Sequence, residues 1–217
     1  TLEKIIKEAK PDIVFHLAAQ PIVKIGYEEP INTWETNLMG SLNLLQSLKD
    51  LNQSCSVVVV TTDKVYKNNE WVFGYREIDQ LGGHDPYSAS KAALEIAVSS
   101  WRDSFCMNNT QGLQIKIATA RAGNVIGGGD WAPNRIVPDV IKSLISGKEL
   151  IIRNPDSTRP WQHVLEPLWG YMLLAKAIYE NNQGYNESFN FGPGVCSNRK
   201  VKEVVEKIFE LWPGKYS

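Results

Sequence analysis

The sequence predicts an α/β protein in which helices flank a parallel β-sheet. Short apolar runs, typical of buried strands, alternate along the chain with longer segments that have the apolar periodicity of amphipathic helices. Such alternation is typical of a sheet whose parallel strands are connected through helices. The run Val57-Val58-Val59-Val60 is apolar at every position, which predicts a strand buried on both faces.

The first part of the chain shows this alternation most regularly. Its compact apolar runs predict strands, and its longer segments with helical periodicity predict helices. The predicted elements, in chain order, are a helix over residues 1–9, a strand over 12–17, a helix over 31–51, a strand over 56–61, a helix over 86–107 and a strand over 113–120.

The last third is less regular and predicts a smaller region of mixed structure. Its predicted elements are a glycine-rich loop over residues 123–129, a helix over 136–146, a strand over 150–153, a helix over 166–180, a strand over 188–191 and a helix over 200–211. We therefore expect a sheet domain over residues 1–133 and a subdomain mainly over residues 134–217, with some later segments returning to the sheet.

Composition and charge argue against several classes of function. The chain has 217 residues, of which 43% are hydrophobic and 22% charged, as in ordinary soluble globular proteins. The net charge of −1 gives no support to a nucleic-acid partner. No apolar run approaches the roughly 20 residues that a membrane-spanning helix needs, so no membrane partner is expected.

The cysteines argue against a disulfide framework or a metal site. Cys55, Cys106 and Cys196 are odd in number and widely spaced, and they form no Cys-x-x-Cys pair. The histidines share no metal-ligand spacing either. We expect no metal, and the cysteine pattern favours a reducing cytoplasm.

Two segments carry the clearest chemical pattern, Thr61-Thr62-Asp63-Lys64 after the apolar run and Tyr87-Ser88-Ala89-Ser90-Lys91 at the start of a predicted helix. Tyr87 and Lys91 are four residues apart, so both side chains leave the same helical face. A free tyrosine has a pKa of about 10, and a neighbouring positive charge favours its phenolate. The pattern predicts a proton-transfer site at the end of a buried strand.

Lys64 has two explanations. The ordinary one is a solvated lysine after a strand. Next to Asp63, and at the same sheet edge as Tyr87 and Lys91, it is instead a candidate proton acceptor, and burial beside Lys91 would favour its neutral amine. An adjacent acid and base whose proton affinities differ can deliver one proton and remove another.

Two other segments follow predicted strands at the edge where open α/β sheets bind ligands. Residues 15–20 read Phe-His-Leu-Ala-Ala-Gln, and residues 123–131 read Gly-Asn-Val-Ile-Gly-Gly-Gly-Asp-Trp. Small residues let a ligand approach the backbone closely. The ordinary explanations are a tightly packed turn and a flexible surface loop, so it is the position of these segments that favours a binding site.

Arginines of the last third are candidates for binding phosphate, because the planar guanidinium can make two hydrogen bonds to one phosphate. For any single arginine a surface role in solubility is the commoner explanation. The candidates are Arg135, Arg153 and Arg159.

These motifs resemble those of the extended short-chain dehydrogenase/reductase family, which includes nucleotide-sugar epimerases and dehydratases. The strand-end threonine with Tyr-x-x-x-Lys, and Arg-Pro-Trp-Gln-His-Val at residues 159–164, are similar to family motifs. Asp63-Lys64 and Gly-Gly-Gly-Asp-Trp-Ala at residues 127–132 resemble the 4,6-dehydratase branch, in particular its members that act on CDP-glucose. The resemblance covers nearly the whole chain. It implies a partial Rossmann-like NAD-binding domain over residues 1–133, which lacks the first βαβ unit, and a mainly substrate-binding subdomain over residues 134–217.

The resemblance also implies residue roles. The implied catalytic residues are Thr62, Asp63, Lys64, Tyr87 and Lys91. The implied NAD contacts are Leu17, Ala18, Ala19, Gln20, Asn37, Thr61, Tyr87, Lys91, Ala120, Gly123 and Val125. The implied nucleotide-sugar contacts are Gln20, Asn124, Trp131, Arg135, Arg153, Arg159 and His163.

The implied reaction removes water from CDP-D-glucose through transient oxidation at C4 by bound NAD, for deoxysugar and O-antigen-type polysaccharide synthesis. The implied assembly is a homodimer formed through the two long helices. A related enzyme remains an alternative, namely a dehydratase for GDP-mannose or dTDP-glucose or a nucleotide-sugar 4-epimerase, and the residues present leave NAD and NADP both open. A non-catalytic dinucleotide-binding protein is a third reading, which the intact threonine, tyrosine and lysine set argues against.

The ends of the chain do not look like domain boundaries. No Gly-x-x-Gly-x-x-Gly turn precedes the first predicted strand, although dinucleotide-binding sheets normally open with such a turn because it holds the pyrophosphate. We therefore expect an internal fragment of a longer enzyme, inactive by itself.

Overall fold

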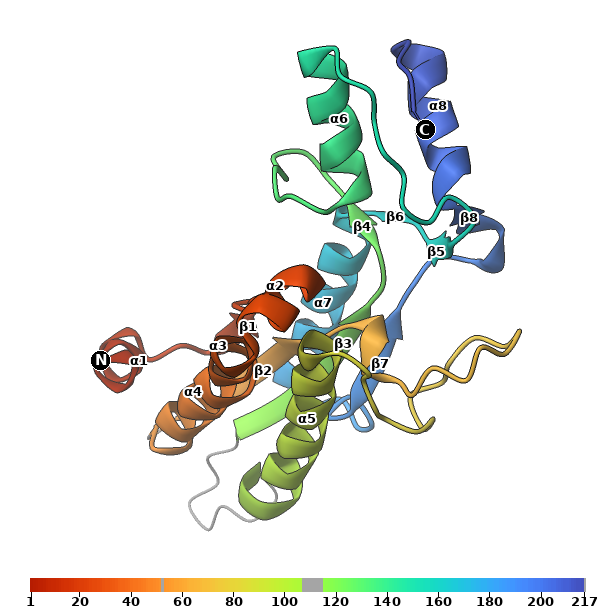
Figure 1. The fold of residues 1–217 in the computed structure, drawn as a ribbon. Helices are drawn as coiled ribbons and strands as arrows, with labels where there is room; N and C mark the ends of the chain where they lie inside the picture. The colour runs from red at the N-terminus through yellow and green to blue at the C-terminus, as the bar shows by residue number, and fades with distance from the viewer. Residues whose placement is uncertain (52, 107–114, 217) are drawn as a thin grey trace. The chain divides into compact units, whose positions relative to one another are not determined.

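The computed structural model describes residues 1–51, 53–106 and 115–216 (Figure 1). The chain divides into two compact units. The larger consists of Thr1–Ala122 and Leu168–Phe191, and the smaller consists of Gly123–Pro167 and Gly192–Ser217. The segment Leu168–Phe191 therefore returns to the unit that contains the sheet.

The larger unit is built on a parallel sheet. Within the described residues the strand order is β1 (Ile13–His16), β2 (Cys55–Val60), β3 (Ile115–Ala122) and β7 (Ser188–Phe191), and every neighbouring pair is parallel. The predicted α/β class with a parallel sheet is confirmed. Because the strands are parallel, their carboxyl ends share one edge.

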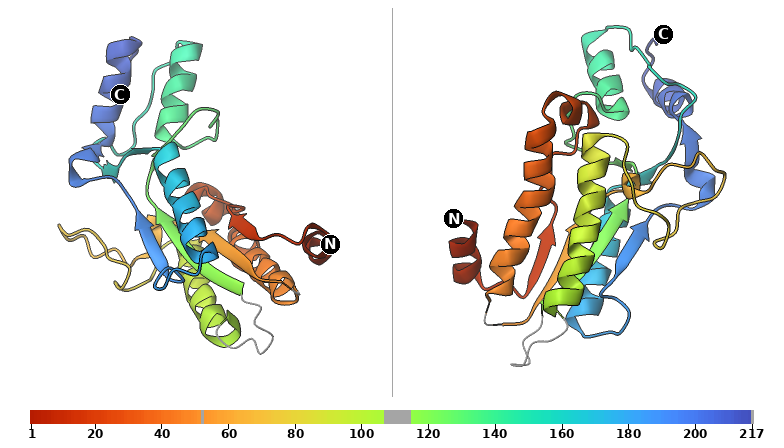
Figure 2. Two further views of the ribbon diagram at one scale, coloured as in Figure 1. Left: turned by 180° about the vertical axis from the view of Figure 1, so that it is seen from behind. Right: turned by 60° about the horizontal axis from the view of Figure 1, so that its bottom comes forward.

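Two long helical segments cover one face of this sheet. One comprises α3 (Pro30–Trp34), a π-helical turn over Glu35–Met39 and α4 (Gly40–Lys49), and the other comprises α5 (Pro86–Trp101) and a π-helical turn over Arg102–Cys106. Figure 2, right, shows α4 and α5 side by side in front of the strands. Burial of apolar side chains drives this packing, and the fully or nearly fully buried contacts are Leu45, Leu48, Val57, Val59, Leu94, Val98 and Ile117.

Helix α7 (Leu165–Tyr179) covers the opposite face of the sheet. Its Leu174 and Ile178 pack on Val58 and Ala118. Successive side chains of a strand point to opposite faces, so Val57 and Val58 enter different cores. This explains why the run is apolar at every position.

The smaller unit combines two helices with two short strand pairs. Helices α6 (Ile136–Ser146) and α8 (Val201–Leu211) lie side by side (Figure 1), and they share a small core around Val140 and Val205. Strand β4 (Val125–Ile126) pairs in parallel with β6 (Gln162–His163), and β5 (Thr158–Pro160) pairs antiparallel with β8 (Asn198–Lys200).

The remaining elements show where the predictions from sequence were incomplete. Helix α1 (Leu2–Ala9) was predicted, whereas α2 (Val23–Glu28) and strands β4, β5, β6 and β8 were not. The strand predicted over residues 150–153 is wrong, because Leu150 makes only an isolated bridge to Tyr216. The predicted helix end at Met107 and strand start at residues 113–114 lie outside the described residues. No helix of the described ranges is long and apolar enough to cross a membrane.

Candidate active site

The start of α5 is fixed by its cap and by a glycine. Asp85 is the N-cap: its carboxylate accepts from the Ser88 backbone N–H at 3.0 Å and from Ser88 Oγ at 2.6 Å. Pro86 occupies the first turn, where its missing N–H costs nothing. A Cβ on Gly83 would lie 2.3 Å from the backbone of Ser88 and Ala89, so only glycine lets the preceding loop pass this close to the helix.

Tyr87, Lys91 and Glu95 follow one another at four-residue spacing on α5, so they share one helical face. All are buried, with 8%, 3% and 2% of their surface exposed respectively. Helix α2 packs against the first of them, since a Cβ on Gly26 would lie 3.3 Å from the Tyr87 backbone nitrogen. The structure therefore brings the predicted tyrosine and lysine together and adds a carboxylate that the sequence analysis missed.

The Lys91 ammonium lies at the end of β2. Its Nζ donates to the carbonyl oxygen of Val60 at 3.0 Å. Burial lowers the pKa of Lys91 to about 8, while the negative charge of Glu95 acts in the opposite direction. A buried cation is unfavourable without compensation, so a negative charge that develops beside Lys91, such as a tyrosine phenolate, is stabilised there.

His16, at the end of β1, is neutral near pH 7. Burial, with help from the charge of Lys91, lowers the pKa of its imidazole to about 4. Ser41 Oγ donates to the Asn37 carbonyl oxygen at 2.7 Å, so the 2.7 Å contact between His16 Nε2 and Ser41 Oγ is a hydrogen bond donated by the histidine. His16 therefore adds no positive charge beside Lys91.

Thr62, Asp63 and Lys64 form a compact turn directly after the strand end. Asp63–Val65 is a single 3-10 turn that Thr62 caps through a 3.4 Å bond from the Lys64 backbone N–H. Asp63 Oδ1 accepts from Thr62 Oγ1 at 3.1 Å and from Lys64 Nζ at 3.0 Å. Lys64 is half-buried: 38% of its side chain is exposed where it forms the ion pair with Asp63.

Gln20 and Asn37 bind each other. Asn37 Oδ1 accepts from the Gln20 backbone N–H at 2.8 Å, and Asn37 Nδ2 donates to the Gln20 carbonyl at 3.2 Å and to Ser90 Oγ at 3.0 Å. The Gln20 amide donates to Thr33 Oγ1 at 2.8 Å. These bonds hold the segment after β1 against α3 and α5. Their predicted contacts with cofactor or sugar remain predictions.

The other predicted cofactor contacts lie in two environments. Leu17 and Ala18 are exposed just beyond β1, and Ala19 is half-buried. Ala120 is fully buried in the core against α7, and its carbonyl accepts from the Thr61 backbone N–H at 2.8 Å. Gly123 and Val125 belong to the smaller unit.

The edge of the larger unit fits the nicotinamide side of a dinucleotide. Lys91 has three N–H groups and donates one to Val60, which leaves donors for ribose hydroxyl groups. Ala18 and Ala19 leave the backbone beyond β1 approachable. No cluster of His, Cys, Asp and Glu in the described residues could hold a metal ion.

The predicted sugar-nucleotide residues, Gln20 apart, lie in the smaller unit. Arg135 pairs with Asp130 at 2.8 Å, Arg159 donates to its neighbour's carbonyl at 2.6 Å, and Arg153 is exposed. His163 Nδ1 accepts from the Leu165 backbone N–H at 3.3 Å. A cavity of about 220 Å³ lies beside Trp131. It is lined by residues 125–131 together with Val137, Pro138 and Ile141.

Asn124 differs from these neighbours in that its Oδ1 is buried and finds no hydrogen-bond donor among the described residues. A buried unpaired acceptor is costly. A hydroxyl or amino group of a ligand could satisfy it, so the predicted role of Asn124 in binding the sugar nucleotide remains a prediction.

Residues 1–209 match the model of the family described as GDP-mannose 4,6 dehydratase. A curated relative, the CDP-glucose 4,6-dehydratase of Salmonella typhimurium, is 48% identical over 212 residues, which is 97% of this chain and 59% of that protein. The chain thus spans less than two thirds of this relative's length.

Solved structures share the fold. The UDP-glucose 4-epimerase of Thermotoga maritima with UDP-glucose is 26% identical, with a TM-score of 0.83 over 100% of this chain and 67% of that one. A double mutant of the dTDP-glucose 4,6-dehydratase of Streptomyces venezuelae, with NAD and DAU bound, is 21% identical, with a TM-score of 0.80 over 98% of this chain and 62% of that one. At this level of identity the second likeness is one of fold.

Proposed function

This chain belongs to the GDP-mannose 4,6 dehydratase family, and we propose that the protein of which it forms part removes water from CDP-D-glucose to give CDP-4-dehydro-6-deoxy-D-glucose. The observation that carries the proposal is the Asp63–Lys64 pair, with 3.0 Å between Nζ and Oδ1, in the turn that Thr62 caps. It provides an acid and a base side by side. The 48% identity to a CDP-glucose 4,6-dehydratase supports CDP-glucose as the substrate.

NAD is the proposed cofactor, held on its nicotinamide side by Lys91, Tyr87, Thr61 and the backbone of residues 17–20. Family membership supports this choice, as do the donors that Lys91 has left beyond its bond to Val60. NAD bound there would supply a hydride acceptor for the oxidation at C4 of the sugar and, once reduced, a hydride donor for C6. The protein's own residues must then move the protons.

Tyr87 is the proposed first base. As its phenolate it takes the proton of the sugar 4-hydroxyl, and Lys91, one helical turn away, stabilises that phenolate. Thr62 Oγ1, which bonds to Asp63 at 3.1 Å, can rotate to bind the sugar 4-oxygen. The ketone that results at C4 makes the proton at C5 acidic.

Elimination needs a neutral base and a neutral acid, and one proton shift supplies both. Transfer of a proton from Lys64 Nζ to Asp63 Oδ1, across 3.0 Å, turns the ion pair into an amine and a carboxylic acid. A substrate that covers the pair favours the neutral form, since neutral groups cost less to desolvate than charges. Lys64 then removes the C5 proton and Asp63 protonates the leaving 6-hydroxyl, which restores the ion pair.

The smaller unit is proposed to bind the nucleotide sugar. Arg159, Arg135 and Arg153 are proposed to contact its phosphates, and Asn124, Trp131 and His163 are proposed to contact its other groups. The exposed positions of Arg153 and Arg159 support this role, because both guanidinium groups are open to an incoming phosphate. Gln20 is proposed to contribute from the larger unit.

A homodimer in the cytoplasm is the proposed assembly and location, and deoxysugar or lipopolysaccharide synthesis is the proposed use of the product. Exposed apolar side chains on the two long helical segments support the dimer: Ile31, Met39 and Ile96 are 69%, 50% and 62% exposed. Unpaired Cys55, Cys106 and Cys196 are consistent with a reducing compartment.

The test uses the full-length protein with CDP-glucose and NAD, and follows the absorbance that alkali induces in 4-keto-6-deoxy sugars. We expect a signal with CDP-glucose and little with UDP-, dTDP- or GDP-sugars. Lys64→Met should reduce elimination by roughly 10²- to 10⁴-fold, the usual contribution of a general base, while reduced nicotinamide still forms in a single turnover. Normal elimination by Lys64→Met and by Asp63→Asn would exclude the roles assigned to this pair.

A further inference from the structure

A buried ion pair joins the helix of Tyr87 and Lys91 to the sheet. Arg121 Nη2 donates to Glu95 Oε2 at 2.8 Å, and only 4% and 1% of the two side chains is exposed. Buried ion pairs are often no more stabilising than apolar residues of the same size. A contribution to stability therefore does not by itself explain why this helix carries a charge on its inner face.

The Glu95 carboxylate accepts hydrogen bonds from three hydroxyl groups, two on strands and one directly beyond a strand. Its Oε1 accepts from Thr61 Oγ1 at 2.5 Å, directly beyond β2, and its Oε2 accepts from Thr119 Oγ1 on β3 at 2.8 Å and from Ser188 Oγ on β7 at 3.1 Å. One carboxylate therefore ties α5 to β3, to β7 and to the residue that immediately precedes Thr62. These bonds fix α5 both along and across the sheet.

The Arg121 guanidinium also contacts the segment that follows the turn of Asp63 and Lys64. Its Nη1 donates to Tyr66 Oη at 2.8 Å and to the Glu77 carbonyl at 3.0 Å. The Tyr66 hydroxyl in turn donates to Asn190 Oδ1 at 2.7 Å. Tyr66 directly follows the Asp63–Val65 turn, so Arg121 holds the segment that carries Asp63 and Lys64.

We propose that Glu95 and Arg121 act as one positioning unit that sets the separation between the Tyr87 and Lys91 face of α5 and the turn of Thr62, Asp63 and Lys64. Neither residue is assigned a contact with substrate. The proposal rests on the proposed function, since it concerns the geometry of the same two proton-transfer steps. Displacements of about 1 Å at a catalytic group can cost roughly 10²-fold in rate.

The pair also influences the charge of Lys91. Tyr87 and Glu95 share the helical face of this ammonium, and His16, at the end of β1, is close enough for the charge of Lys91 to lower its pKa. The turn of Asp63 and Lys64 packs against the same helix, and Arg121 pairs with Glu95. Charged residues of the neighbouring α2 and π-helical turn, Lys24, Glu28 and Glu35, are exposed. The negative charge of Glu95 raises the pKa of Lys91 against the lowering effect of burial, so loss of that charge favours the neutral amine.

The test is Glu95→Gln in the full-length protein, which keeps the shape of the side chain and removes its charge. We expect kcat to fall by roughly tenfold to a hundredfold with a KM for the sugar nucleotide within about threefold of wild type, as for a loss confined to the transition state. We also expect the alkaline limb of the kcat profile to move to lower pH, because Lys91 then loses its proton sooner. An unchanged kcat, or a fall in kcat/KM that comes from a raised KM alone, would overturn the proposal.

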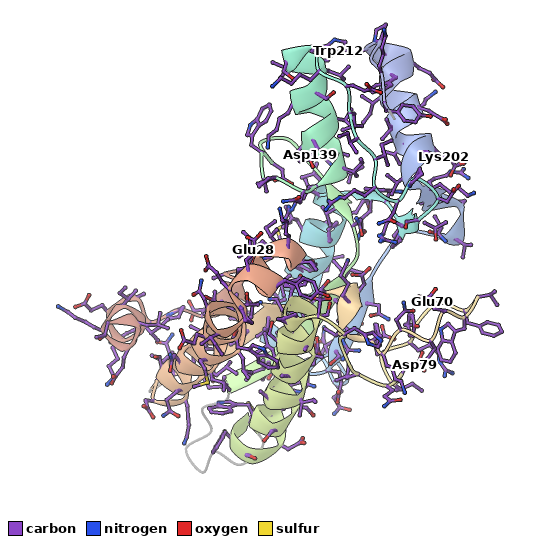
Figure 3. All side chains as sticks on the ribbon, in the orientation of Figure 1. Glu28, Glu70, Asp79, Asp139, Lys202 and Trp212 are labelled. Carbon is purple, nitrogen blue, oxygen red and sulfur yellow. The ribbon has the colours of Figure 1, made fainter. Side chains whose placement is uncertain are left out.

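Two further variants keep the test decisive. Asp79→Asn is the matched control: its carboxylate pairs with Arg76 at 2.9 Å, on the loop that leads to α5 (Figure 3), and the wild-type kcat and pH profile are expected. Tyr66→Phe removes only the hydroxyl that links Arg121 to the turn, and it should lower kcat several-fold without moving the alkaline limb. If Glu95→Gln does not fold, a wild-type kcat for Tyr66→Phe overturns the proposal.

If the proposed function is wrong, the outcome can be told apart from failure of the positioning role. In that case the wild-type protein does not turn over CDP-glucose, and the positioning role is tested by amide hydrogen exchange instead. Faster exchange in Glu95→Gln over residues 61–66 and 86–91, with unchanged exchange in α6 and α8, would support the proposal. Unchanged exchange over both catalytic segments would overturn it.

Discussion

The two units hold their polar side chains in different ways. In the larger unit the Glu95 carboxylate, the Arg121 guanidinium and the Lys91 ammonium are buried and bonded to other groups of the protein. In the smaller unit Arg153 and Arg159 are exposed, and Asp156 is 67% exposed where it pairs with Lys200. The difference indicates that the groups proposed to support proton transfer are held in place by the protein, whereas the arginines proposed to bind phosphate are open to solvent.

The largest expected effect follows from breaking the buried pair. Arg121→Met leaves the Glu95 carboxylate buried without its cation, which should lower the free energy of unfolding by about 3–5 kcal/mol. Urea-induced unfolding of the full-length protein measures this. Asp156→Asn, which removes an exposed carboxylate bonded to Lys200 and Lys202, should leave the unfolding curve unchanged. Equal effects of the two variants would contradict the contrast between the units.

A smaller effect is expected on the stability of the fold at acidic pH, through His16. The folded pKa of about 4 lies below the ordinary 6.5, so the unfolded chain binds a proton more readily between these values, and the histidine destabilises the fold as pH falls through this window. Near pH 5 the expected loss is about 2 kcal/mol relative to pH 7.5.

His16→Gln, which keeps a donor toward Ser41, should reduce the acid sensitivity of unfolding measured at the two pH values. His84→Gln is the control, because His84 is exposed in the loop before α5 and its replacement should leave that sensitivity as in wild type. An identical response of the two variants would show that His16 does not contribute.

The smallest expected effect is in the smaller unit. Arg159→Ala should raise the KM for the sugar nucleotide by roughly tenfold and change kcat little, because an exposed guanidinium contributes about equally to ground-state and transition-state binding of a distant phosphate. Steady-state kinetics of the full-length enzyme measure both constants. A fall in kcat with unchanged KM would instead place Arg159 among the preorganised groups.

Local pattern predicted the elements whose burial is expressed in their own residues. The valine run predicted β2 because it meets a core on each side, and the spacing of Tyr87 and Lys91 predicted their shared face because helical geometry requires it. Helix α6 and strand β7 have the predicted bounds. Their signals are contained within the segment itself.

The short strands were missed because their signal does not lie within the segment itself. Strands β4 and β6 have two residues each, and such segments become strands only through a partner far along the chain. Residues 150–153 were predicted as a strand from their apolar side chains, but Leu150 and Ile152 enter the core with Val140 and Val205 instead. An apolar pattern indicates burial, whereas the choice of partner depends on the fold.

The same distinction applies to the candidate site. The sequence by itself determined a parallel α/β sheet, a hydroxyl and an acid–base pair after a buried strand, and a tyrosine and lysine on one helical face. Only the tertiary structure showed that Lys64 forms an ion pair with a half-buried Asp63 and that Glu95 bonds to Arg121, 26 residues further along the chain. The physical reason is that periodicity is a local property, whereas the environment of a charge depends on groups that the fold brings together from distant segments.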